Sequence, residues 1–161
     1  MLVSDFKYYR DLYYLTLPSE VNVRVSSVYF KLYKLNNGDL LDELKKTTEW
    51  KNLENIKNFN YKEYSKSLIS VLGLDFTIYL INEFNSIMQL KTKISNKIDV
   101  YNYFKKYKRY SVSVYKNYKN KLLRIVDKLN TTSENFCCIN NEIIFENYID
   151  ITDDINFNDY L

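Results

Sequence analysis

The chain of 161 residues contains no histidine, which removes the side chain that most often serves as a general acid or base. Without histidine, neither a Ser-His nor a Cys-His pair can activate a nucleophile. The only two glycines, Gly38 and Gly73, stand far apart, so a P-loop and a dinucleotide-binding fingerprint are both excluded. Carboxylate or lysine chemistry stays open, but the sequence favours a non-catalytic protein and indicates no cofactor.

Turn-forming residues are scarce, with one proline and two glycines in the chain. A β-sandwich or barrel would need a breaker every ~8–12 residues. The sequence therefore predicts a mainly α fold, a single-domain helical bundle. Alanine is absent as well, while Lys, Asn, Ile and Tyr are abundant, which indicates an AT-rich genome. The 17 tyrosines are partly a result of that bias and are discounted as evidence of function.

Signals for export, membrane insertion and metal binding are also missing. No apolar run resembles a membrane span, and the first residues lack the pattern of a secretory signal. We therefore expect a cytoplasmic protein in a reducing compartment, without membrane insertion. The adjacent cysteines Cys137 and Cys138 do not have zinc-site spacing, and the acids near the C-terminus lack the glycine of a calcium loop, so no metal is predicted.

Helical spacing begins at Pro18, which fits the first turn of a helix. An apolar stripe then follows steps of four and three residues: Val21, Val25, Val28, Leu32 and Leu35. Strands are the alternative for residues 1–35, because several of these residues are β-branched or aromatic. We favour helices, since the sequence from 36 to 38 supplies a natural stop.

Several residues predict where the following helices begin and end. Asp39 and either Thr47 or Thr48 are expected to cap helices, and Gly73 is expected to end one. Asp75 is predicted to cap the next helix, which carries the most apolar run of the chain as far as Ile94. This run is predicted to be the central core helix.

A strongly basic stretch runs from Lys91 to Lys128, with twelve cations and two acids, a net +10 in a chain whose total is +3. Its apolar residues can share one helical face if the helix is continuous, although residues 111–113 could break it in two. The face consists of Val100, Phe104, Tyr107, Val114, Tyr118, Leu122, Ile125 and Leu129.

Cations interleaved with tyrosines suit a phosphate backbone with unpaired bases. Lysines outnumber arginines ten to two in the stretch, which argues for backbone contacts rather than base reading. The predicted phosphate contacts are Lys105, Lys106, Lys108, Arg109, Lys116, Lys119 and Lys121. The predicted stacking residues, expected to lie off the apolar face, are Tyr103, Tyr110 and Tyr115.

The C-terminal part is opposite in charge, with seven acids and no cation between Glu134 and Leu161. Residues 136–145 are predicted as a small β-hairpin that completes a helical domain of residues 1–145. Residues 146–161 are predicted as a solvated acidic tail whose deletion leaves the protein folded. Such a tail could fold back on the basic stretch or compete with a polyanion.

One short segment resembles a known family. Leu17, Pro18, Glu20, Val21 and Val25 are similar to the opening of an F-box, a three-helix module that binds an adaptor protein. Later counterparts near Asp39 and Trp50 stand several residues too far along. A proline and an acid in a first helical turn produce the same letters through capping alone, so we assign no family.

The sequence thus favours an accessory protein that binds nucleic acid through its backbone, with RNA or an RNA–protein assembly as the expected partner. The alternative is a helical protein–protein interaction module or adaptor, of the kind used by viruses or parasites, whose apolar groove takes a partner helix. Their salt dependence separates them, because backbone-led binding weakens steeply as salt rises.

Overall fold

The computed structural model describes residues 2–35, 38–132 and 155–161. These residues form seven α-helices and one 3-10 turn, with no strand among them, which confirms the mainly α prediction. The chain runs through α1 (Leu2–Leu15), α2 (Pro18–Tyr33), α3 (Leu40–Lys45), α4 (Thr48–Lys57), α5 (Tyr61–Leu72), α6 (Leu74–Ile87), α7 (Lys97–Thr132) and η2 (Phe157–Tyr160). The predicted hairpin of residues 136–145 lies outside the described residues.

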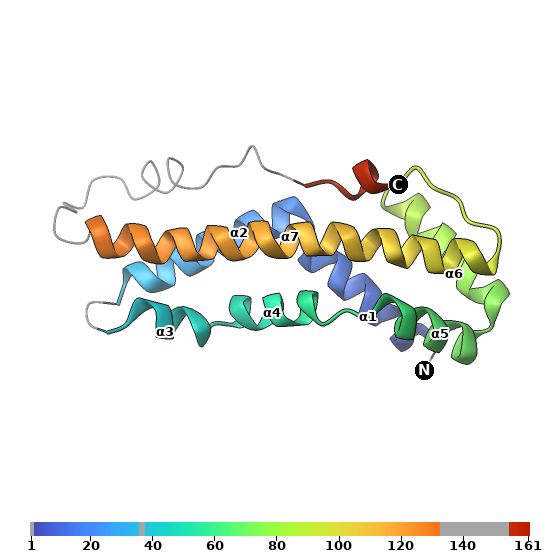
Figure 1. Ribbon diagram of the computed structural model, residues 1–161, viewed down its shortest axis with the longest axis horizontal. Coiled ribbons are helices and arrows are strands. Elements are labelled where there is room, and N and C mark those ends of the chain that lie inside the picture. The colour runs from blue at the N-terminus through green and yellow to red at the C-terminus, as the bar shows by residue number, and fades with distance from the viewer. Residues whose placement is uncertain (1, 36–37, 133–154) are drawn as a thin grey trace.

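The long helix α7 runs the length of the molecule, and the other helices pack along it (Figure 1). The chain extends in one direction through α1 and α2, returns through α3, α4 and α5, and crosses one end in α6. It then runs back through α7, which packs against α2, α3, α4, α5, α6 and η2. At 36 residues α7 is about 54 Å long, so it is the central helix of the fold.

Local chemistry explains several helix boundaries. The Asp39 side chain accepts a hydrogen bond from the Leu41 amide, and the Thr47 hydroxyl accepts one from the Trp50 amide, so both predicted caps are confirmed. Leu2–Leu15 and Pro18–Tyr33 are helical rather than β, and the predicted stripe is buried at Val21, Val25, Val28 and Leu32. Its last predicted residue, Leu35, lies beyond the end of α2 and is 40% exposed.

Two predictions about α6 are wrong. Gly73, at a φ of 82°, both ends α5 and precedes α6, so Asp75 lies inside the first turn and is not the cap. The helix ends at Ile87. Two residues later Gln89 adopts a left-handed φ of 57°, and the Leu90 amide then donates to the Asn85 carbonyl. The predicted core helix therefore stops early, and α7 takes its place.

Among the described residues, no single helix is both long and apolar enough to cross a bilayer. The pair α5 and α6 reaches that length and hydropathy only when taken together, across a bend of 115°.

The last seven residues are part of the folded domain, which corrects the prediction of a wholly solvated tail from 146 to 161. Phe157 is 1% exposed and packs edge-on against Tyr103 and Tyr107, with ring centroids 5.7 and 5.5 Å away. The Tyr160 hydroxyl donates to Ser113 Oγ at 2.8 Å, and Asn158 Oδ1 accepts a bond from the Lys91 amide. These contacts hold residues 155–161 against α7.

Candidate nucleic-acid interface

The buried side of α7 contains the predicted apolar face in full. All eight of its predicted residues, from Val100 to Leu129, are at most 7% exposed. The helix is continuous through residues 111–113, where the hydroxyls of Ser111 and Ser113 donate to the carbonyls of Lys108 and Arg109 one turn earlier. The buried arc is nevertheless wider than predicted, and it also takes in Tyr103, Tyr110, Ser111, Lys121 and Val126.

Tyr103 belongs to the core, and the expectation that it lies off the apolar face is wrong. It is 2% exposed, and its hydroxyl donates to Asn85 Oδ1 at 2.7 Å and lies 2.7 Å from the Tyr9 hydroxyl. Burial raises the pKa of Tyr103 well above its ordinary value. A ring enclosed in this way cannot stack on a base.

Tyr110 is likewise buried, at 1% exposure, so the same correction applies to it. Its hydroxyl donates to the Thr16 carbonyl, and its ring packs against Phe157 and Tyr160. Tyr115 differs from both, because its side chain is only half-buried. It is the one predicted stacking residue with an accessible surface, and Lys119 Nζ lies 5.7 Å from its ring centroid.

The four cations predicted to act together between residues 105 and 109 fall on different sides of α7. Lys105 and Arg109 are exposed, whereas Lys106 and Lys108 are half-buried on opposite flanks. Lys108 Nζ donates to the Lys57 carbonyl at 2.9 Å, which places a positive charge at the C-terminal end of α4. This hydrogen bond engages the Lys108 amine in the packing of α7 on α4, and partial burial lowers its pKa.

Of the predicted phosphate contacts, Lys121 is the most deeply buried. It is 3% exposed, and its Nζ donates to Asn22 Oδ1 of α2 at 3.2 Å. An amine enclosed between two helices cannot reach a phosphate, so Lys121 joins α7 to α2.

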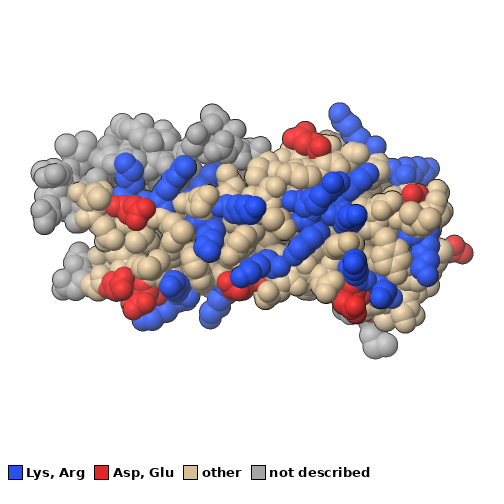
Figure 2. All heavy atoms as spheres, viewed as in Figure 1, with Lys and Arg blue, Asp and Glu red and all other residues tan. Residues whose placement is uncertain are grey.

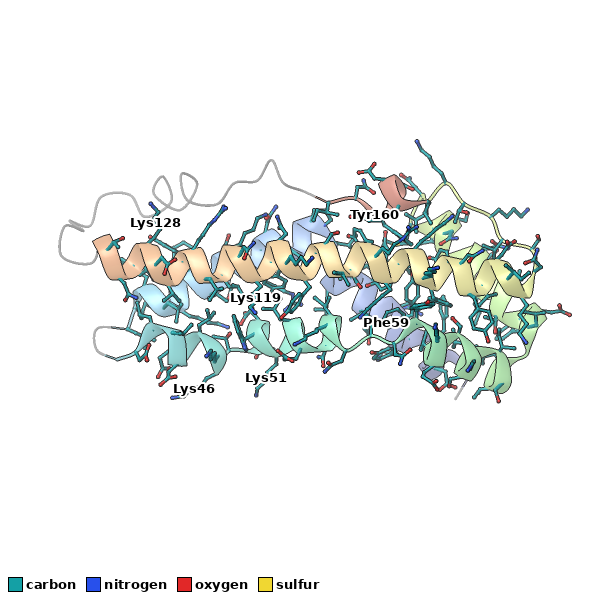
Figure 3. The ribbon with its side chains drawn as sticks, viewed as in Figure 1. Lys46, Lys51, Phe59, Lys119, Lys128 and Tyr160 are labelled. Carbon is teal, nitrogen blue, oxygen red and sulfur yellow. The ribbon has the colours of Figure 1, made fainter. Side chains whose placement is uncertain are left out.

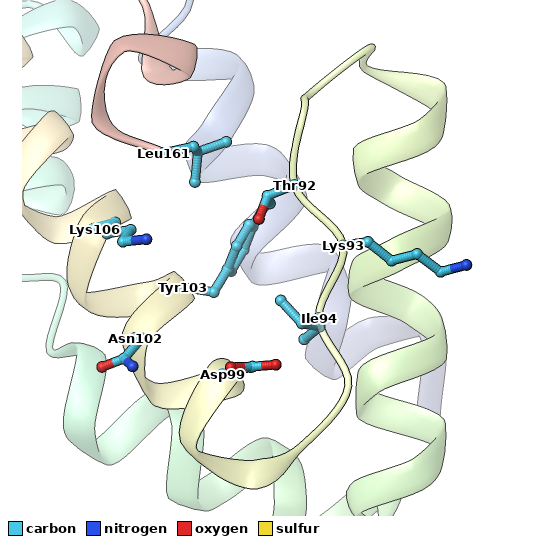
Figure 4. A pocket seen from close by; sticks show the side chains of 8 residues that line it. All are labelled: Thr92, Lys93, Ile94, Asp99, Asn102, Tyr103, Lys106 and Leu161. Atoms are coloured by element: carbon cyan, nitrogen blue, oxygen red, sulfur yellow. The ribbon is translucent and has the colours of Figure 1, made fainter.

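Lys106 borders a small polar pocket of about 110 Å³ between α7, the segment before it and the C-terminal residue (Figure 4). Asp99, on the same pocket, already accepts bonds from the amide and hydroxyl of Ser95. Lys93 points away from the pocket, and its side chain is exposed. The pocket therefore brings together no cluster of cations that would hold a phosphate.

Three of the predicted cations form one exposed row, here called the basic ridge: Lys105, Arg109 and Lys116. Offsets of four and eleven residues return to the same side of a 3.6-residue helix, and the row spans about 16 Å. The half-buried Lys119 lies beside this row, on the side of α7 that faces α4, while Tyr160 lies on the opposite side (Figure 3).

The basic ridge makes no ion pair with an acid in the described part of the chain. The ion pairs found there join Arg24 to Glu20, Lys31 to Glu49 and Lys46 to Glu43, all within α2, α3 and α4 or just beside them. In the face shown in Figure 2, lysine and arginine side chains gather over α7 and along its border with α4 and α5, and acids are fewer. Arg124, an exposed cation of α7 that the sequence prediction left out, adds to this charge.

No family model, curated protein or solved structure matches this chain. The resemblance of residues 17–25 to an F-box gains no support from these comparisons. In the fold, Pro18 begins α2, and Glu20 pairs with Arg24 at 3.6 Å one turn later. Both residues thus have ordinary helical roles.

Proposed function

We propose that this is a non-catalytic protein that binds the sugar–phosphate backbone of nucleic acid through the basic ridge, with RNA or an RNA–protein assembly as the partner. The observation that carries the proposal is the row of three exposed cations without an acid partner in the described fold. The helix that presents them, α7, has ten cations and two acids, a net charge of +8. We retain with it the expectation of an intracellular location.

The cost of placing these cations together supports an anionic partner. Lys105 and Arg109 stand one turn apart on the same side of the helix, where like charges repel by ~0.2–0.5 kcal/mol. A phosphate between them converts that repulsion into two charge-assisted contacts. Because α7 is fixed by packing along its whole length, little entropy is lost in ordering the helix on binding.

The burial of Tyr103 and Tyr110 changes how the partner is held. Contact is led by phosphates, so binding is tolerant of sequence and sensitive to salt. Tyr115 is left as the stacking residue, and its accessible ring is the feature that favours a single strand over a duplex.

The test is fluorescence anisotropy of a labelled single-stranded oligoribonucleotide over a salt titration, with wild type compared to Lys105→Gln/Arg109→Gln/Lys116→Gln. Three phosphate contacts on a single strand give a slope of log K against log salt of about −2, so affinity falls ~20-fold between ~50 and ~200 mM salt. The triple variant should lose most of this slope and bind at least ~10-fold more weakly at low salt.

The matched control replaces three other exposed cations with Gln: Lys7 on α1, Lys34 at the end of α2 and Lys45 on α3. It removes the same charge as the triple variant. Its slope should remain within about one unit of wild type. Absence of wild-type binding at ~50 mM salt would reject nucleic acid as the partner. Equal losses in the two triple variants would show that net charge, and not the basic ridge, attracts the polyanion.

A protein–protein interaction is the second candidate function, favoured by the apolar side chains exposed on α6. Binding of that kind should change little over the same salt range.

A further inference from the structure

Helix α6 is apolar on two sides. Thr77, Ile81 and Phe84 face inward and are at most 6% exposed. On the outer side, Tyr79 and Ile87 are 56% and 73% exposed. Large apolar side chains exposed together on one side of a helix typically mark a surface that another molecule covers.

The outer side of α6 borders a groove against α1 with a volume of about 230 Å³. Its apolar lining comes from both helices: Phe6, Tyr14, Leu80, Phe84, Ile87 and Met88. Two charged side chains complete the lining, Arg10 from α1 and Glu83 from α6. Both are exposed, and neither has an ion-pair partner within residues 2–35, 38–132 and 155–161.

The charges decide which occupant fits. A lipid surface is disfavoured, because α6 has no cation and Glu83 stands among its exposed apolar side chains. A nucleic acid is disfavoured for the same reason. An unrelated protein would have to present an acid to Arg10 and a cation to Glu83 above an apolar patch.

A second copy of this chain meets those requirements by symmetry. A two-fold axis through the groove brings Arg10 of each copy toward Glu83 of the other, and it covers Ile87 with the same patch of the partner. We infer that the α1–α6 groove is the interface of a symmetric dimer, held by the outer side of α6 and by reciprocal Arg10–Glu83 pairs. This inference is independent of the proposed nucleic-acid binding.

Sedimentation velocity of the full chain over about a hundred-fold range of concentration tests the dimer. Wild type should pass from monomer to dimer, and Ile87→Glu should weaken dimerisation at least ~10-fold. Val23→Glu is the matched control, since Val23 is an apolar residue on α2 that is 66% exposed, and it should dimerise as wild type does. Circular dichroism checks that both variants remain helical.

Charge exchange tests the pairing itself. In a dimer of the Glu83→Arg variant, two cations would face each other at both pairs, and in a dimer of the Arg10→Glu variant, two acids would do so. Because like charges repel, each variant should be monomeric at concentrations where wild type is dimeric. Mixing the two variants should restore a heterodimer, because each cation then faces an acid of the other chain.

Three outcomes overturn the inference. The first is a wild type that remains monomeric at the highest concentration; binding of that monomer to neutral vesicles through Ile87 would then identify lipid as the occupant. The second is an Ile87→Glu variant that dimerises as tightly as Val23→Glu, which would place the interface elsewhere. The third is a mixture of the charge variants that stays monomeric, which would exclude the reciprocal pairs.

Discussion

Replacing Phe157 with alanine tests whether residues 155–161 belong to the folded domain. The ring is 1% exposed, and its centroid lies 5.3 Å from that of Tyr110 and 6.2 Å from that of Tyr13. Truncating a buried Phe costs ~3–5 kcal/mol. The loss cannot exceed the free energy with which residues 155–161 pack onto the helices, because beyond that point the segment detaches and the helices remain folded. We therefore expect about 3 kcal/mol, at the lower end of that range.

Urea unfolding followed by circular dichroism and by Trp50 fluorescence measures this loss, and thermal unfolding should show a fall of ~6–12 °C. Asp159→Asn is the matched control, because Asp159 is an exposed residue of the same 3-10 turn, and its cost should stay within ~0.5 kcal/mol. If Phe157→Ala were as stable as this control, the last seven residues would contribute nothing to the fold.

Two further predictions concern the core and the helix ends. Burial raises the pKa of Tyr9, Tyr103 and Tyr107 above the unfolded value of ~10, so the stability they provide is complete below that pH and is lost as pH rises above it. An ultraviolet titration should show that these buried tyrosines ionise only as helicity is lost; ionisation of nearly all tyrosines in a folded chain would contradict this. Thr47→Ala should cost ~1 kcal/mol because it removes the cap of α4, whereas Asp75→Ala should cost only ~0.3–1 kcal/mol. Thermal unfolding compares the two, and a larger loss for Asp75 would show that it caps α6 after all.

The helical class and several boundaries could be predicted because their signals are local. The caps at Asp39 and Thr47 depend on a side chain and an amide two or three residues away. The buried stripe of α2 depends on spacing alone, and it holds at Val25 and Val28, both 0% exposed.

The width of a buried face is not local, and this explains the errors at Tyr103, Tyr110 and Lys121. An amphipathic helix packed on one side has a narrow apolar stripe, but α7 is contacted by helices around much of its circumference. Tyrosine suits a core as well as a surface when its hydroxyl finds a partner, as it does at Asn85 and Thr16. The sequence cannot show that such a partner will be in place.

The burial of Phe157 has a similar explanation. Phe157 lies in a segment rich in Asp and Asn, which has the composition of a solvated tail. Its burial depends on a socket formed by α1 and α7, whose residues lie more than forty positions away in the sequence.

The polar groups of the core connect the fold to the proposed site. Apolar packing alone allows a long helix to rotate about its axis, because neighbouring apolar side chains can replace one another at small cost. Directional hydrogen bonds do not allow this, and α7 makes them to three different helices: Tyr103 to Asn85 on α6, Lys108 to Lys57 on α4, and Lys121 to Asn22 on α2. A turn of one residue position, about 100°, would break all three and move the basic ridge toward its neighbours. The residues lost from the predicted interface thus hold Lys105, Arg109 and Lys116 on the outer side of the molecule.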